Sequence, residues 1–194
     1  QGVSAYELLK RHTGLEGELL KQAARFGCVW LESGAKPKRL RRLKQRLNQG
    51  DVIHLYLNEA LLLAEIPQAT CIADETDYSI WFKPRGMFSQ GSKWGDAHSI
   101  SRFVELALER PAYLVHRLDR MTAGLMIIAH RKKLVQSFTE LFTQRAIEKV
   151  YYAVSFGQPP ASHFTMNELL DDRPAETLAW LLSYDADRDR ALLR

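Results

Sequence analysis

Five consecutive residues in the middle of the chain, 116–120, read His-Arg-Leu-Asp-Arg and combine the side chains that acid–base and nucleophilic chemistry require. They lie between two apolar segments, 113–115 and 125–129. Ionisable groups in such surroundings cost free energy unless they are paired or used. A carboxylate with an ordinary pKa of about 4 is ionised at neutral pH and is a competent nucleophile when it is positioned. Two interpretations follow: a buried Arg–Asp pair that holds a turn, or a site in which Asp119 acts on a substrate.

A hydrolase that uses His116 with Asp119 is a further alternative. Their spacing is common, and the sequence has no Gly-x-Ser-x-Gly motif. The remaining histidines show no metal-ligand spacing, so the sequence gives no indication of a metal site. Cys28 and Cys71 stand alone in sequence, which argues against a zinc ribbon or a disulfide framework and favours the cytoplasm. No apolar run approaches the roughly 20 residues of a membrane-spanning helix.

The elements that would position these residues differ between the two ends of the chain. In the first third, apolar spacing predicts two short helices within 6–24, separated at Gly14 and Gly17. Strands are expected at 26–31 and 52–57, with turns before and after a basic stretch.

The excess of positive over negative charge lies entirely in that first third. The chain carries a net charge of +4, and residues 1–60 hold 11 Lys and Arg against 6 Asp and Glu. Such an asymmetry indicates a polyanionic partner, or else a basic face that is merely solvated. The charges concentrate in 36–46 as Lys36, Lys38, Arg39, Arg41, Arg42, Lys44 and Arg46.

Residues 1–60 resemble the alpha-L RNA-binding domain of a small-subunit ribosomal protein and of many RNA-modifying enzymes. The resemblance rests on the order of two helices, a strand, the basic stretch and a closing strand that begins Gly-Asp-Val-Ile at Gly50. It implies that the seven basic residues bind RNA, because Lys and Arg neutralise phosphates without reading sequence. We expect this domain to be followed by a linker at 61–70 and a second domain at 71–194.

The second domain is predicted to be α+β. Strands are expected at 78–82, 113–115, 125–129, 149–156 and 178–184, and helices at 100–110 and 134–142. Because strands and helices do not alternate regularly, the pattern favours a mixed, mainly antiparallel sheet.

Three motifs in this domain, in the same order, resemble those of the RluA-type RNA pseudouridine synthases. Segment 116–125 has His-Arg-Leu-Asp followed two residues later by Thr-Ala-Gly-Leu, where the family usually has Thr-Ser-Gly-Leu. Segment 81–86, Trp-Phe-Lys-Pro-Arg-Gly, is similar to an early family segment, and 142–154 contains the later Lys-x-Tyr. The resemblance implies the pseudouridine synthase fold and an isomerase that needs no cofactor.

The resemblance also implies roles for single residues. Asp119 corresponds to the family aspartate that attacks the ribose C1′ of a flipped-out uridine or helps to remove a ribose proton. Arg117 corresponds to the arginine that fills the vacated space, and Tyr151 to the tyrosine that packs on the flipped base. Arg120, Lys149 and Lys83 are expected to contact RNA or to orient the site. His116 is expected either to contact the substrate or to make a structural hydrogen bond.

The family carries one further segment, whose arginine pairs with the catalytic aspartate, and this chain stops about where it should begin. Two alternatives follow: the chain is part of a longer product, with the C-terminal part of the catalytic domain missing, or the protein lacks the partner arginine. The expected partner of this monomer is ribosomal RNA, with transfer RNA as the alternative. A protein of the same fold that binds RNA without catalysis is the other hypothesis.

Overall fold

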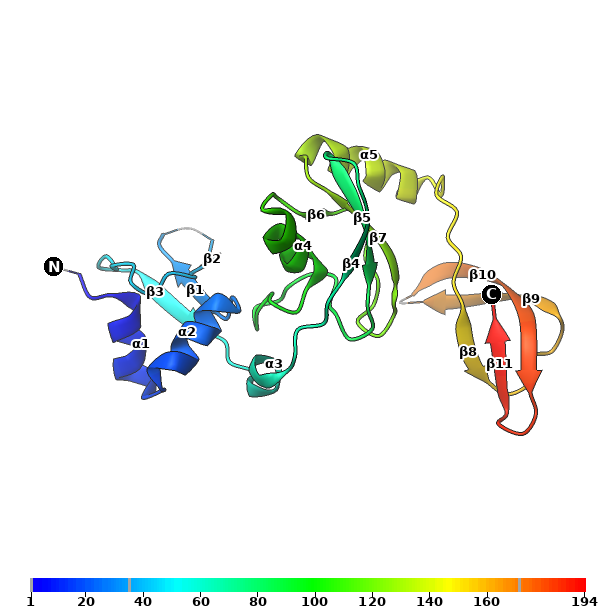
Figure 1. Cartoon of the computed structure of the whole chain (residues 1–194), viewed down its shortest axis with the longest axis horizontal. Coiled ribbons are helices and arrows are strands. Elements are labelled where there is room, and N and C mark those ends of the chain that lie inside the picture. Colours follow the sequence, from blue (N-terminus) through cyan, green and yellow to red (C-terminus); the bar gives the residue numbers. More distant parts are fainter. Residues whose placement is uncertain (1, 35, 171) are drawn as a thin grey trace. The chain divides into compact units, whose positions relative to one another are not determined.

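The computed structural model describes residues 2–34, 36–170 and 172–194, and it forms two compact units, Gln1–Gln144 and Arg145–Arg194. Figure 1 shows the order of the elements along the chain. All strand pairs in its three sheets are antiparallel. The α+β class and the mainly antiparallel sheets that the sequence predicted are confirmed.

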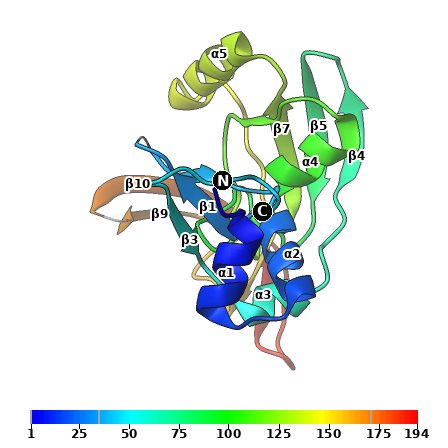
Figure 2. The same ribbon diagram turned by 90° about the vertical axis from the view of Figure 1, so that its left-hand side faces the viewer.

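The two helices predicted in the first third of the chain are present and pack on a small sheet, which includes one strand that was not predicted. Ser4 caps the first helix in a reciprocal bond with Glu7, and Gly14 ends it in the left-handed region, at φ 67°. Figure 2 shows these two helices beside the sheet, against which they bury a common apolar core. The helices are α1 (Ala5–Thr13) and α2 (Gly17–Arg25), and the sheet has the order β2 (Lys38–Arg39), β1 (Val29–Glu32) and β3 (Val52–Leu55).

A short helix, α3 (Glu59–Leu63), occupies part of the region expected to be a linker. Asn58 caps it by accepting a hydrogen bond from the Leu61 amide. Leu62 is buried in the core beneath α1 and α2, and its carbonyl accepts a 2.9 Å hydrogen bond from Gln22 Nε2. This segment therefore packs on the first domain.

The rest of the first unit is a four-stranded sheet with two helices. Its core contains Trp81 and Met126 from the sheet and Ile100 and Val104 from a helix. The strand order is β4 (Thr70–Asp74), β5 (Tyr78–Lys83), β7 (Gly124–Ala129) and β6 (Tyr113–Leu114), and the helices are α4 (Ile100–Leu108) and α5 (Lys132–Thr143). All but β4 were predicted.

The second unit is a separate four-stranded sheet. The order is β8 (Ala153–Phe156), β11 (Arg190–Leu193), β10 (Arg173–Asp185) and β9 (His163–Leu170). The strand expected at 149–156 begins only at Ala153, and β9 and β11 were not predicted. Among the described residues of this unit, Ala179 and Ala191 are the buried apolar ones.

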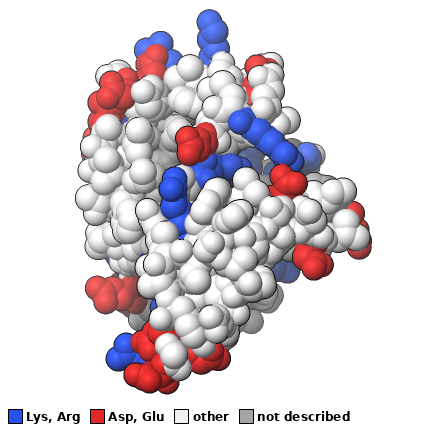
Figure 3. Space-filling model, turned by 90° about the vertical axis from the view of Figure 1, so that its right-hand side faces the viewer, with Lys and Arg blue, Asp and Glu red and all other residues white. Residues whose placement is uncertain are grey.

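Large apolar side chains of the second unit lie exposed. Uncharged side chains cover most of the face drawn in Figure 3. The exposed apolar residues are Val150, Tyr151, Tyr152, Val154, Phe156, Met166, Leu169, Leu178, Trp180, Leu182 and Leu192. Nowhere in the described part of the chain is there a helix long and apolar enough to cross a membrane.

Candidate active site

The loop between β6 and β7 carries Asp119 and is tied down on both sides of it. The Leu118 amide donates a 3.0 Å hydrogen bond to Ser89 Oγ, and the Ser89 hydroxyl donates to the Leu118 carbonyl. On the other side, the Gly86 amide donates a 2.8 Å hydrogen bond to the Arg120 carbonyl. Because both neighbours of Asp119 are bonded to the segment after β5, the backbone beneath the carboxylate is fixed.

The Asp119 side chain itself is exposed. Its backbone carbonyl closes a turn by accepting a 3.1 Å hydrogen bond from the Thr122 amide. Among the described residues, none forms a hydrogen bond or an ion pair with the carboxylate. Both carboxylate oxygens are therefore open to a substrate, which is the arrangement that a nucleophile requires. The interpretation of Asp119 as half of a buried Arg–Asp pair is wrong for this structure.

Lys83 lies beneath the loop and is fully buried. Its Nζ atom donates to the Met87 carbonyl at 2.8 Å and to the Pro84 carbonyl at 3.2 Å, and it lies 3.5 Å from the Arg120 carbonyl. Burial lowers the pKa of Lys83, and the negative charge of Asp119 opposes that shift. Of the two roles expected for this lysine, the geometry favours orienting the site over direct contact with RNA.

The two arginines beside Asp119 differ in their surroundings. Arg117 is exposed, so its guanidinium group is accessible to a substrate. Arg120 is also exposed, but its Nε donates a 3.2 Å hydrogen bond to the Gly86 carbonyl and its guanidinium lies 4.7 Å from the centre of the Phe88 ring. Arg120 therefore helps to hold the loop as well as presenting a cation next to Asp119.

His116 is engaged within the protein. Its Nε2 accepts a 3.0 Å hydrogen bond from the Ile127 amide, and its ring centre lies 4.5 Å from that of Phe142. An accepting Nε2 leaves the proton of the neutral ring on Nδ1. These contacts favour the structural role for His116 over contact with the substrate.

Tyr151 and Lys149 belong to the second unit, where both are exposed and precede β8. The loop that carries Asp119 belongs to the first unit, and each unit is described by itself. The roles that the resemblance implies for these two residues therefore stay predictions.

The seven basic residues of 36–46 separate into two groups. The half-buried Arg39 and Arg41 form ion pairs with Asp96, in the loop before α4. The exposed residues, whose cations remain available to a polyanion, are Lys36, Lys38, Arg42, Lys44 and Arg46.

Sequence reasoning missed two residues that shape this region, Ser89 and Asp96. Ser89 carried no sequence signal beyond its place after the Lys-Pro-Arg-Gly segment. Asp96 follows two closely spaced glycines, Gly91 and Gly95, which mark a loop with a close backbone approach. Within the described residues, no three His, Cys, Asp or Glu side chains are grouped so that they could hold a metal ion.

The chain is similar to known proteins over most of this region. A family described as RNA pseudouridylate synthase matches residues 77–189. An uncharacterized RNA pseudouridine synthase of Chloroflexus aurantiacus is 32% identical over 104 residues, which cover 45% of this chain and 33% of that protein. The ribosomal large subunit pseudouridine synthase C of Rickettsia conorii is 33% identical over 110 residues, or 50% of this chain and 34% of that protein. The chain thus spans only about a third of the length of these relatives.

Two solved structures share the fold. Human RNA pseudouridylate synthase domain containing 1 matches with a TM-score of 0.54 and 14% identity, over 67% of this chain and 59% of that one. Human RNA pseudouridylate synthase domain containing 4 matches with a TM-score of 0.50 and 19% identity, over 63% of this chain and 56% of that one. At such identities the likeness establishes the fold alone.

Proposed function

Because the chain belongs to the RNA pseudouridylate synthase family, we propose that the protein to which it contributes converts specific uridines of a structured RNA into pseudouridine, with Asp119 as the nucleophile. The observation that carries the proposal is the exposed Asp119 carboxylate on a loop that is fixed through both of its neighbours, Leu118 and Arg120. A fixed backbone under an open carboxylate places the reacting oxygen without occupying it.

The reaction is an isomerisation that needs no redox partner. The bond between the ribose C1′ and uracil N1 breaks, the uracil turns, and a bond forms between C1′ and C5. The proton on C5 is lost and N1 gains one, so that the formula of the nucleotide is unchanged. The Asp119 carboxylate either bonds C1′ while the base turns or takes a proton from the ribose, and it is free again at the end.

The residues around Asp119 divide this work. The nucleotide must leave the RNA stack, at a cost of a few kcal/mol. The exposed Arg117 cation enters the space left by the base, where its plane stacks and bonds phosphate. Arg120 offers a second cation to the RNA. Tyr151 packs on the turned base, and Lys149 contacts the RNA beside it.

We assign RNA binding to residues 1–60, joined through 61–70 to the catalytic region 71–194. The exposed Lys and Arg side chains of 36–46 support this assignment, because they supply phosphate contacts. Ribosomal RNA is the proposed substrate, and the Rickettsia conorii relative is named for the large ribosomal subunit. The thiols of Cys28 and Cys71 are free, which agrees with a reaction in the reducing cytoplasm.

The test uses the full-length gene product with bulk ribosomal RNA and, separately, bulk transfer RNA. After incubation the RNA is digested to nucleosides and separated by chromatography. New pseudouridine in ribosomal RNA, with no free uracil, is the expected result. Pseudouridine in transfer RNA alone would show that transfer RNA, and not ribosomal RNA, is the substrate. Free uracil would indicate a hydrolase. Binding of RNA with neither product would support a protein that only binds RNA.

A further inference from the structure

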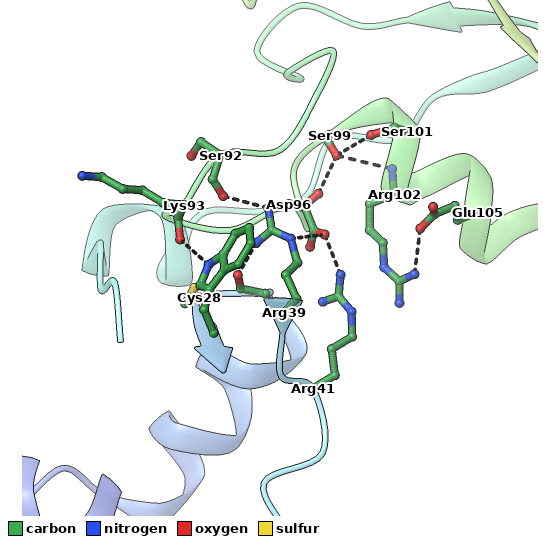
Figure 4. Close-up of polar contacts among 12 residues, drawn as sticks. Cys28, Arg39, Arg41, Ser92, Lys93, Asp96, Ser99, Ser101, Arg102 and Glu105 are labelled. Atoms are coloured by element: carbon green, nitrogen blue, oxygen red, sulfur yellow. Dashed lines mark hydrogen bonds and ion pairs between the residues drawn. The ribbon is translucent and has the colours of Figure 1, made fainter. Parts of the chain in front are cut away.

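Asp96 joins the basic stretch of the first domain to the loop that leads into α4. Its Oδ2 lies 3.1 Å from Arg39 Nε and 2.5 Å from Arg41 Nη2, and Figure 4 shows both guanidinium groups converging on it. The exposed fractions of the three side chains are 13% for Asp96, 19% for Arg39 and 28% for Arg41. Partly buried charges in such a cluster are screened less by salt than surface charges are.

Backbone and side-chain hydrogen bonds surround this cluster. The Asp96 amide donates a 2.9 Å bond to the Phe26 carbonyl. Trp30 Nε1 donates a 3.1 Å bond to the Lys93 carbonyl, and the Cys28 thiol donates a 3.3 Å bond to the Trp94 carbonyl. The first domain therefore contacts the loop along its length, and the contact does not depend on charge alone.

The loop fits so closely that two of its positions have no space for a side chain. A Cβ at Gly91 would lie 2.4 Å from the Cβ of Asp96 in the same loop and 3.0 Å from Arg39 Nη2 of the first domain. A Cβ at Gly95 would lie 2.8 Å from the Phe26 carbonyl oxygen, and φ at Gly95 is 129°. Such an approach requires glycine, so the sequence of the loop is adapted to this contact.

Other donors of the two arginines are also committed. Arg41 Nη1 donates a 2.9 Å bond to the Arg25 carbonyl. Arg39 donates to the carbonyls of Gly27 and Ser92, and its guanidinium lies 4.4 Å from the Trp30 ring centre. Several donors of Arg39 and Arg41 are therefore occupied inside the protein.

Asp96 is also connected to the catalytic part of the chain. Its carbonyl accepts a 2.7 Å hydrogen bond from the Ser99 hydroxyl, and Ser99 caps α4. That helix carries Ile100 and Val104 into the core beneath the sheet that positions Asp119. A rigid connection therefore runs from the basic stretch through Asp96 to the catalytic sheet.

We infer that Asp96 is a positioning residue: it fixes the basic domain on the catalytic region and thereby helps to select the uridine that reaches Asp119. The inference rests on the proposed function. Phosphate contacts set where an RNA lies but carry no base information. If the domain that makes those contacts is held at a fixed distance from Asp119, only uridines at the matching distance in a folded RNA are presented.

The first arm of the test measures the contact without RNA. Cys28 lies in the interface and is buried, whereas Cys71 is exposed. Iodoacetamide labelling of each cysteine is followed by mass spectrometry in the full-length protein. Asp96→Asn is expected to speed the labelling of Cys28 by at least about tenfold and to leave Cys71 unchanged. Asp187→Asn is the matched control, because Asp187 is an exposed turn residue of the second unit.

The second arm measures selection of the substrate, with 5-tritiated bulk ribosomal RNA and a short unstructured 5-tritiated RNA. For Asp96→Asn, kcat/KM on ribosomal RNA is expected to fall about tenfold, while kcat/KM on the short RNA stays within about twofold. Asp96→Glu keeps the charge and is expected to restore most of the loss. The unchanged reaction on the short RNA shows that the variant is folded.

Three outcomes would overturn the inference. Cys28 labelling that does not change in Asp96→Asn would show that Asp96 does not hold the domain. If Asp96→Asn keeps the wild-type kcat/KM on both RNAs, or loses the same factor on both, Asp96 does not help to select the substrate uridine. If the wild-type protein releases no tritium at all, the proposed function fails, and the labelling arm alone then decides whether Asp96 fixes the domain.

A double-mutant cycle separates positioning from direct RNA contact by Arg41. If Arg41 acts through Asp96, the double variant Arg41→Gln with Asp96→Asn loses no more ribosomal RNA activity than the worse single variant. If Arg41 instead contacts phosphate independently, the two losses multiply. Multiplied losses would contradict a positioning role for the ion pair between Arg41 and Asp96.

Discussion

At the scale of single residues, Lys83 brings a buried ammonium group to the backbone that carries Asp119. Water is excluded from Nζ, and its three nearest acceptors are carbonyl oxygens. Burial lowers the pKa of Lys83 below its ordinary value of 10.5. The unfolded chain therefore binds this proton more tightly than the folded chain, and the charged form costs folding free energy at neutral pH.

The lowered pKa of Lys83 determines how the free energy of unfolding depends on pH. As pH rises from the folded pKa of Lys83 toward 10.5, the cost is relieved. The free energy of unfolding of the wild type should therefore rise relative to that of Lys83→Met through this window. Urea unfolding at a series of pH values measures the difference, with exposed Lys133→Met as the control. A difference that stays constant with pH would contradict the account.

The sequence also predicted the surroundings of some single residues and not of others. The charged string between two apolar strands made residues 116–120 stand out in the sequence, but only the family resemblance of segment 116–125 predicted a catalytic role for Asp119. The seven basic residues of 36–46 look alike in sequence. Only the position of Asp96, some 50 residues further along, separates Arg39 and Arg41 from the other five.

At the scale of elements, the loop before α4 acts through its glycines. Gly95→Ala would place a Cβ against the Phe26 carbonyl, in addition to the strain of a positive φ. We expect this variant to loosen the interface and to speed the alkylation of Cys28, whose pKa burial raises to about 11. The matched control is Gly50→Ala, where φ is 92° but no atom lies within 4 Å of the new Cβ.

The two glycine variants give a direct comparison of contact with strain. Gly50→Ala should lower the free energy of unfolding by about 1 kcal/mol and leave Cys28 labelling at the wild-type rate. Equal labelling of Cys28 in both variants, measured by mass spectrometry, would refute the claim that the loop of Gly95 seals the interface.

Sequence patterns predicted elements that carry a strong periodic signal and missed those that do not. Helical spacing predicted α1, α2, α4 and α5, and apolar runs predicted β5 and β7. Strand β4 was missed because it is short and largely exposed, so it has no buried face to produce alternation. Helix α3 had a signal, an Asn followed by Glu at its start, but five residues are too few for a period.

At the scale of the whole molecule, the two units differ in how much core they hold. The first unit contains two clusters of buried apolar residues. Within the described part of the second unit, Ala179 and Ala191 are the buried apolar residues, while aromatic side chains such as Tyr152 and Phe156 are exposed. A sheet that buries so little apolar area gains little free energy on folding.

Residues 145–194 are therefore expected not to fold when produced alone, whereas residues 1–144 are expected to unfold cooperatively on heating. Circular dichroism of the two fragments tests this directly. A cooperative thermal transition in the isolated 145–194 fragment would show that this unit folds without any other part of the protein covering its exposed apolar side chains. The sequence could not reveal this difference, because apolar residues are frequent in both units and only the structure shows which are covered.

Tritium release from 5-tritiated ribosomal RNA, measured for the full-length protein and its Asp119→Asn variant, decides whether Asp119 is the nucleophile. The change preserves the size of the side chain and removes the ionised oxygen. Release by the wild type and by the Asp187→Asn control, with a loss of about a thousandfold or more in Asp119→Asn at unchanged RNA binding, is the predicted result. Release by Asp119→Asn at the wild-type rate would contradict the assignment of Asp119 as the nucleophile.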